Sequence, residues 1–204
     1  PFFRTLGLEL YGLNWIHPEI PAAQAMDNES ALLHRSVAET ARQFGRDEGR
    51  YRLLFQSVVN NWEAIDADVL GPLGIPKSPW TFLQFGLRAP WPALSFLRTF
   101  FRGDGPRALL GGIAAHATLP LEWFPSFAPG FVLALVGHRS GWPLAEGGTQ
   151  SITSALVALL RELGGEVICN RRVASLRELP SHRAVLLDIT PRQLLAFPEI
   201  AAAR

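Results

Sequence analysis

Five histidines and a single cysteine are the side chains of this chain best suited to acid–base, nucleophilic or metal chemistry, and their spacing forms no catalytic pattern. His17 could act as a general base, but no paired acid or nucleophile accompanies it, which favours a structural role. His116 and His138 fall near the ends of predicted helices. There, a histidine that complements the negative end of the helix is favoured over one that faces a ligand. A zinc site is not expected, because the histidines lack metal-ligand spacing and Cys169 is alone.

The carboxylates likewise suggest no pair with the geometry of a general acid and base. Asp188 is the last residue of a predicted strand and could be catalytic, but its position before a capped helix favours a local contact with the backbone. That helix is predicted from a threonine cap at Thr190, a proline at Pro191 and a glutamine at Gln193. The sequence therefore nominates no catalytic acid or base, and no Ser-His-Asp or Cys-His grouping.

The strongest local pattern lies between residues 141 and 176. A turn at Pro143 leads to the pair Gly147-Gly148, and a predicted helix then runs to Gly164-Gly165, where glycine is the cheapest residue for a left-handed C-terminal position. Residues 166–169 and 173–176 are predicted to be strands on either side of a basic turn. The apolar stripe of the helix, expected to pack on this sheet, consists of Ile152, Ala155, Leu156, Leu159, Leu160 and Leu163.

This stretch, GWPLAEGGTQSITSALVALLRELGGEVICNRRVASL, resembles the internal signature of the FAD-dependent phytoene desaturase and amine oxidase superfamily. Within that superfamily it is most similar to the bacterial phytoene-dehydrogenase-related NAD(P)/FAD-dependent oxidoreductases. Three further stretches fit the same group in the same order: PFFRTLGLELYGLNWIHPEIPAA, RALLGGIAAHATLPLE and RAVLLDITPRQLL. The resemblance therefore covers nearly the whole chain.

The resemblance implies an FAD-dependent dehydrogenase or desaturase that removes a hydride from a lipophilic, carotenoid- or isoprenoid-like substrate. In the family, the valine after the second Gly-Gly pair touches the adenine end of FAD through its backbone, and it matches Val173. Val173 could equally be an ordinary strand residue. Gly147-Gly148 would let the backbone approach the cofactor or substrate closely, although a tight turn alone would explain the pair.

A different class of function on the same scaffold is a non-catalytic lipid-binding or escort protein, as the Rab GDP-dissociation inhibitors are. The phosphate-binding turn G-x-G-x-x-G would separate the two, and the 204 residues do not contain it. The chain is therefore expected to be an internal segment of a longer enzyme, lacking the N-terminal dinucleotide-binding motif and inactive by itself.

Composition indicates a folded chain, with 48% hydrophobic and 18% charged residues. The net charge is +1 with scattered basic residues, so no nucleic-acid partner is expected. A single cysteine suits a reducing compartment, and no signal-peptide pattern opens the sequence. These features predict a cytoplasmic protein and leave membrane association open. Substrate identity, electron acceptor and oligomeric state are not predicted.

Residues 72–101 are rich in proline and aromatic residues, and charged residues interrupt them too often for a transmembrane helix. Three interpretations remain: a packed helical subdomain, an apolar cap over a lipophilic substrate, or a surface that contacts a membrane peripherally. Composition alone favours the packed subdomain.

The expected fold class is α/β, with an α+β composition in these 204 residues. Residues 1–140 are predicted to be a mostly helical substrate-binding region, and residues 141–204 to return to the FAD-binding α/β domain. Strands are expected at 31–34 and 184–188, and helices after a capping box at Ser36 and after Asp47. The helix after Asp47 should bury Tyr51, Leu54, Phe55, Val58, Val59, Trp62 and Ile65.

Overall fold

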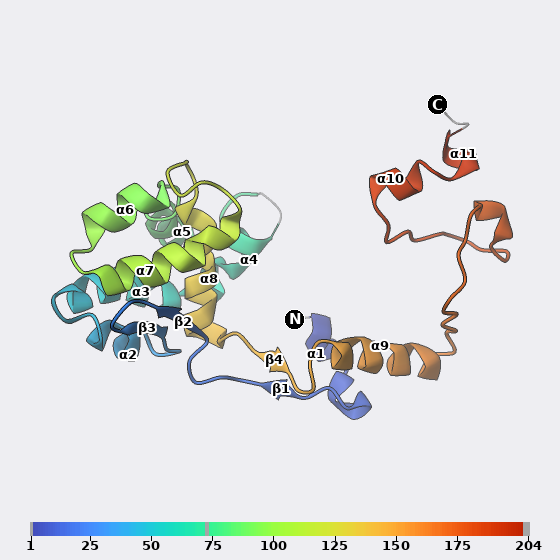
Figure 1. Cartoon of the computed structure of the whole chain (residues 1–204), viewed down its shortest axis with the longest axis horizontal. Helices are drawn as coiled ribbons and strands as arrows, with labels where there is room; N and C mark the ends of the chain where they lie inside the picture. The colour runs from blue at the N-terminus through green and yellow to red at the C-terminus, as the bar shows by residue number, and fades with distance from the viewer. Residues whose placement is uncertain (1, 72–73, 202–204) are drawn as a thin grey trace.

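The computed structural model describes residues 2–71 and 74–201, and it has a mixed α+β composition in which helices predominate (Figure 1). The strands are β1 (Trp15–Ile16), β2 (Ala22–Ala25), β3 (Ser30–Leu33) and β4 (Leu144–Ala145). The α-helices are α1 (Phe2–Thr5), α2 (Val37–Arg42), α3 (Glu48–Asn60), α4 (Trp62–Leu70), α5 (Pro79–Gly86), α6 (Ala93–Phe100), α7 (Asp104–Ala114), α8 (Phe127–Ser140), α9 (Gln150–Glu162), α10 (Pro191–Leu194) and α11 (Pro198–Ala201). Short 3-10 helices are η1 (Leu8–Tyr11), η2 (Gly45–Asp47), η3 (Ala115–Ala117) and η4 (Leu176–Glu178).

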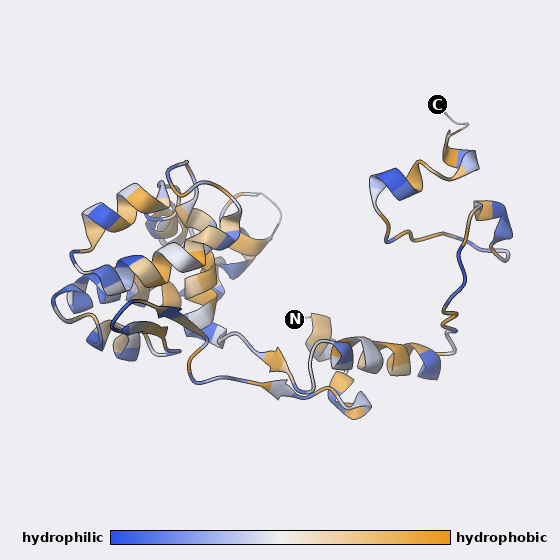
Figure 2. Ribbon diagram, viewed as in Figure 1, coloured by the Kyte–Doolittle hydropathy of each residue, from blue (hydrophilic) through white to orange (hydrophobic). Residues whose placement is uncertain are grey.

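Residues 22–142, called here the helical body, surround the larger of two hydrophobic cores. Figure 2 shows that its central helices α7 and α8 are largely hydrophobic, whereas hydrophilic residues colour much of α2. Helix α8 crosses α7 so closely at Gly130 that a Cβ atom at this position would lie 2.5 Å from the Cα of Ala114. Rings from four helices fill the interior around this crossing. They belong to Tyr51, Phe55, Phe85, Phe96, Phe127 and Phe131.

The predicted helix after Asp47 exists, but it is divided in two at Asn61. The backbone of Asn61 leaves the helical region at φ −109° and ψ 18°, and its side-chain amide donates to the Ser57 carbonyl at 2.7 Å. An asparagine amide competes with the backbone for hydrogen bonds in this way, which explains the interruption. The apolar stripe is buried as predicted on α3 and at Trp62, except that Val59 is only half-buried; the side chain of Ile65 lies outside the described residues.

The first part of the helical body is an antiparallel hairpin of β2 and β3 followed by α2. The predicted strand at 31–34 corresponds to β3. The Ser36 side chain accepts a hydrogen bond from the Glu39 N–H at the start of α2, which is the serine half of the predicted capping box. Asp47, the residue before α3, links the start of that helix to the α6–α7 connection. Its buried carboxylate accepts the N–H groups of Arg102 at 2.9 Å and Gly103 at 2.6 Å.

Helix α9 has the predicted bounds but not the predicted packing partner. Its buried face lies on the 3-10 helix η1, where Ala155 contacts a small second core with Leu8 and Leu13. The expectation that the stripe packs on a sheet is wrong, because the segments after α9 form no sheet there. Leu160 and Leu163, the last members of the stripe, are exposed.

Residues 165–201, called here the C-terminal segment, run away from the helical body in Figure 1. The predicted strands at 166–169, 173–176 and 184–188 are not formed: the first and third lack strand pairing, and the second ends in η4. A strand needs a neighbour for its N–H and C=O groups, and the described residues provide none here. The Thr190 capping box is present as predicted.

The first residues of the chain contact residues that follow the helical body. Strand β1 pairs with β4 in antiparallel register, Trp15 opposite Ala145 and Ile16 opposite Leu144. The division into regions 1–140 and 141–204 stays a prediction. Over residues 2–71 and 74–201, no helix has both the length and the hydropathy needed to cross a membrane.

Candidate functional site

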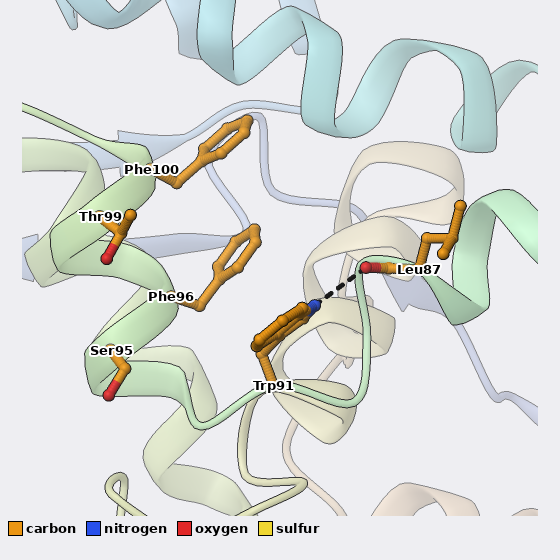
Figure 3. Close-up of a pocket in the computed structure, with 6 residues that line it drawn as sticks. All are labelled: Leu87, Trp91, Ser95, Phe96, Thr99 and Phe100. Atoms are coloured by element: carbon orange, nitrogen blue, oxygen red, sulfur yellow. Dashed lines mark hydrogen bonds between the residues drawn. The ribbon is translucent and has the colours of Figure 1, made fainter.

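The principal candidate site is an apolar groove of about 420 Å³ in the proline- and aromatic-rich region (Figure 3). It lies between the residues that follow α5 and the exposed side of α6. Its lining residues are Leu87, Trp91, Ser95, Phe96, Thr99 and Phe100. None of these six side chains titrates, so the groove can bind and shield an apolar ligand but supplies no acid or base.

Trp91 forms one wall of the groove, and two local features hold it there. Its indole Nε1–H donates to the Leu87 carbonyl at 3.0 Å, which folds the ring back toward the end of α5 (Figure 3). Pro90 and Pro92 flank it and disfavour helix at the residues before them, so α5 gives way to turns at residues 87–90 before α6 begins. The Trp91 carbonyl in turn accepts the N–H of Phe127 at 3.1 Å, which fixes the connection to α8.

Phe96 and Phe100 form the other wall because they lie four residues apart on α6 and therefore share one face. Their rings stack with centroids 5.2 Å apart, and Phe96 also stacks on Phe127 at 4.6 Å. Ala93 and Leu97, next to them on the same side of α6, are buried in the body. The aromatic wall therefore rests on a packed core.

The start of α6 is fixed by a buried hydroxyl. Ser126 accepts the Ala93 N–H at 2.9 Å and donates to the Leu121 carbonyl at 3.0 Å, so both of its roles are used inside the protein. A buried polar group with partners on both sides positions its neighbours strongly. Ser126 thus positions the first turn of α6, and with it the groove.

His138 is the most perturbed histidine, and it lies in the core. Its Nδ1 is 2.9 Å from the His34 carbonyl oxygen, which can only accept, so Nδ1 carries the proton. Its Nε2 therefore accepts the hydroxyl of Tyr51 at 2.9 Å. Burial lowers the pKa of His138 to about 4 and raises the pKa of Tyr51 well above its usual value.

The expectation that His138 complements the negative end of its helix is therefore wrong, because the neutral imidazole ring carries no positive charge. With both ring nitrogens occupied, His138 stabilises the core. His17 and His116 are exposed, and Asp188 is exposed in the C-terminal segment. The structure brings none of these three together with the groove. Within the described ranges there is no cluster of three or more metal-ligating side chains.

Val173 lines a separate cavity of about 310 Å³ in the C-terminal segment. Neither the N–H nor the C=O of Val173 has a hydrogen-bond partner among the described residues. The cavity and the groove share no lining residue. The other residues around Val173 are Arg172, Ala174, Ile189, Gln193, Ala196 and Phe197.

The pair Gly147-Gly148 forms a tight turn before α9. Both residues have positive φ, 75° and 95°, and the Gly148 N–H bonds to the Ala145 carbonyl at 3.0 Å. A side chain at either position would meet no atom of the described chain within 4 Å. The turn alone explains these glycines, because left-handed backbone favours glycine and no described residue packs against them.

Sequence reasoning identified the aromatic region but did not assemble the groove. The available signal was the spacing of Phe96 and Phe100 on one helical face beside a tryptophan between two prolines.

Comparisons of the chain with protein-family models, with curated proteins and with solved structures find no match.

Proposed function

We propose that the chain is part of an FAD-dependent oxidoreductase of the phytoene dehydrogenase-like kind. Its substrate would be lipophilic, carotenoid- or isoprenoid-like, and would lose a hydride to the flavin. The observation that carries this proposal is the ordered series of a Gly147-Gly148 turn, α9, a Gly164-Gly165 turn and Val173, which resembles that superfamily. The apolar groove supports the lipophilic class of substrate.

The groove fits part of a polyene or isoprenoid chain by composition and size. Ligand pockets of about 300–1,000 Å³ with mostly apolar walls suit small molecules, and this groove lies in that range. Trp91, Phe96 and Phe100 would exclude water from the bound chain. Ser95 and Thr99 at the rim could bond only to a polar end of the ligand.

The residues around Val173 fit the adenine end of FAD in two respects. The cavity is lined partly by apolar side chains, and the backbone N–H and C=O of Val173 are free to bond to an adenine edge. Val173 would thus hold one end of the cofactor. The bound flavin would supply the hydride acceptor. The pyrophosphate-binding turn that the family uses is absent from the sequence, so the described residues can account for the adenine end alone.

The first test examines FAD in the protein expressed from its complete reading frame. We expect it to purify with a flavin absorption band and to lose FAD on Val173→Pro, which removes the backbone N–H. Val173→Ala keeps that N–H and is the matched control, with affinity within about threefold of the parent. Circular dichroism checks that both variants fold. A folded Val173→Pro protein that binds FAD as tightly as the parent would disprove the adenine contact.

The second test examines the groove with cis-parinaric acid, a polyene whose fluorescence rises in apolar surroundings. Trp91→Ala should weaken its binding about tenfold or more by removing one wall. Trp123→Ala, another exposed tryptophan outside the groove, should leave binding unchanged. Equal effects of the two substitutions would remove the groove from the proposal. A colourless complete protein that binds the polyene would favour an escort protein over an oxidoreductase.

A further inference from the structure

The outer edge of β3 is closed by side chains at the place where a third strand would lie. In the β2–β3 hairpin the Met26 N–H donates to the Glu29 carbonyl at 2.9 Å. Residues of an antiparallel strand alternate in direction, so the backbone groups of Ser30, Leu32 and His34 point away from β2. Outward N–H and C=O groups of this kind are a template for pairing with another strand.

Gln43, the residue that caps the C-terminus of α2, occupies the position beside Leu32. Its Oε1 accepts the Leu32 N–H at 2.7 Å, and its Nε2 donates to the Leu32 carbonyl at 2.6 Å. In an antiparallel sheet, a residue of the neighbouring strand would make this same pair of bonds. The side-chain amide has both the acceptor and the donor that the pair requires, so Gln43 substitutes for a strand residue.

Thr40 does the same at His34, two residues further along the edge. Its hydroxyl accepts the His34 N–H at 2.8 Å and donates to the His34 carbonyl at 3.2 Å. Thr40 and Gln43 lie three residues apart and therefore share one side of α2, which lies close to β3 in Figure 1. One helix thus closes two successive outward residues in strand register. Ser30, the next outward residue, is exposed.

The closed edge is complementary to a second copy of itself. Residues 29–35 read ESALLHR. In an antiparallel pair centred on Leu32, Glu29 of each copy lies opposite Arg35 of the other. The register also joins the outward groups of Ser30, Leu32 and His34 in both copies. It therefore combines backbone pairing with opposite charges at both ends, an arrangement that stabilises paired strands.

Other charged side chains near this edge do not oppose the pairing. Glu39 and Arg42 on α2 are both exposed and have opposite signs. Asp104 lines a small cavity together with Glu29, and it forms an ion pair with Arg107 at 3.4 Å. The charge complementarity of the edge therefore rests on Glu29 and its opposite residue in the second copy.

We propose that Thr40 and Gln43 guard a self-complementary strand edge, and that this edge pairs with a second copy of the chain when α2 releases it. The surface bound is residues 29–35 of the other copy in antiparallel orientation. Side chains that act as the third strand keep this pairing closed in the structure described here. The proposal concerns the helical body alone, and it holds whether or not the protein binds FAD.

The first arm of the test removes the guard from the protein expressed from its complete reading frame. The substitutions Thr40→Val and Gln43→Leu together, called here the unsealed variant, remove the side-chain hydrogen bonds and change side-chain size little. Sedimentation velocity over a range of concentrations should give the unsealed variant an association constant about tenfold or more above that of the parent. Circular dichroism must match between them, and Gln43→Leu alone replaces the pair if the double variant misfolds.

Gln56→Leu is the matched control for the added apolar side chain. The Gln56 amide donates to the Asn60 side chain at 2.9 Å on α3, so this substitution also removes a hydrogen bond but leaves the β3 edge closed. Its association constant should equal that of the parent. An equal rise for Gln56→Leu and the unsealed variant, or no rise for the unsealed variant, would overturn the proposal.

The second arm tests the register by charge reversal in the unsealed variant. Arg35→Glu alone and Glu29→Arg alone should each lower the association constant about fivefold, because like charges then lie opposite each other at both ends. Mixing these two variants should restore association, because opposite charges meet again in the mixed dimer. Association that neither reversal nor mixing changes would place the contact on another surface, such as the outer edge of β2, and would overturn the proposal.

Discussion

The helical body and the C-terminal segment contain similar proportions of apolar residues, yet only the body buries most of their side chains. In the body, rings such as Phe55 and Phe131 are fully buried among neighbouring helices. In the C-terminal segment, Ile168 and Leu186 are exposed, Leu186 by 96%. Helices satisfy their own backbone hydrogen bonds and need only a face to bury, whereas extended segments need partner strands as well. Within the described residues the body therefore has a packed core, whereas the apolar side chains of the C-terminal segment are largely left exposed.

The largest expected effect compares one aromatic of the body with one leucine of the C-terminal segment. Phe131→Ala removes a ring that touches Phe55, Phe85 and Phe127, and should lower the free energy of unfolding by about 3–5 kcal/mol. Leu186→Ala removes an exposed side chain and should change it by less than about 0.5 kcal/mol. Denaturant unfolding followed by circular dichroism measures both. Similar losses would mean that residue 186 is packed as firmly as the body.

The next effect concerns the pH dependence of the body. Because burial lowers the pKa of His138 from 6.5 to about 4, the unfolded chain binds a proton between these pH values that the folded chain does not. Stability should therefore fall as the pH decreases through this window, by about 3 kcal/mol at pH 4. Thermal unfolding at several pH values measures this. His138→Gln should reduce the slope of stability against pH. His116→Gln, which replaces an exposed histidine, should leave that slope unchanged. Equal slopes for the parent and His138→Gln would contradict the account.

A smaller effect tests the packing of α9. Leu159 is half-buried against the second core, so Leu159→Ala should cost about 1–2 kcal/mol, less than a fully buried leucine. Leu163 lies on the same predicted stripe but is 76% exposed, so Leu163→Ala should cost less than about 0.5 kcal/mol. Thermal unfolding distinguishes them. Equal costs would indicate that α9 packs against more of the protein than η1 alone.

The sequence predicted those elements whose signals are local. The Ser36 and Thr190 caps, the bounds of α9 and the buried stripe on α3 all depend on residues within one or two turns. Strand pairing is a property of two segments, and the strands predicted in the C-terminal segment failed because a pattern of apolar residues cannot supply the neighbour.

The site was predictable only in composition for the same reason. The aromatic residues of the groove were visible, but their assembly depends on contacts distant in sequence, such as Trp91 with Phe127 and Ala93 with Ser126. His138 shows the same limit. Its place at a helix end was predicted, but its neutral state follows from burial, and its ring orientation from Tyr51 and the His34 carbonyl, 87 and 104 residues away.

The central proposal is that the helical body folds by itself and that the C-terminal segment holds the adenine end of FAD. Hydrogen exchange of the complete protein, with and without saturating FAD, tests it most directly. We predict strong protection of α3, α7 and α8 in both states, and protection of residues 171–174 that rises when FAD binds. Unchanged exchange at 171–174 in a protein that visibly holds FAD would contradict the claim.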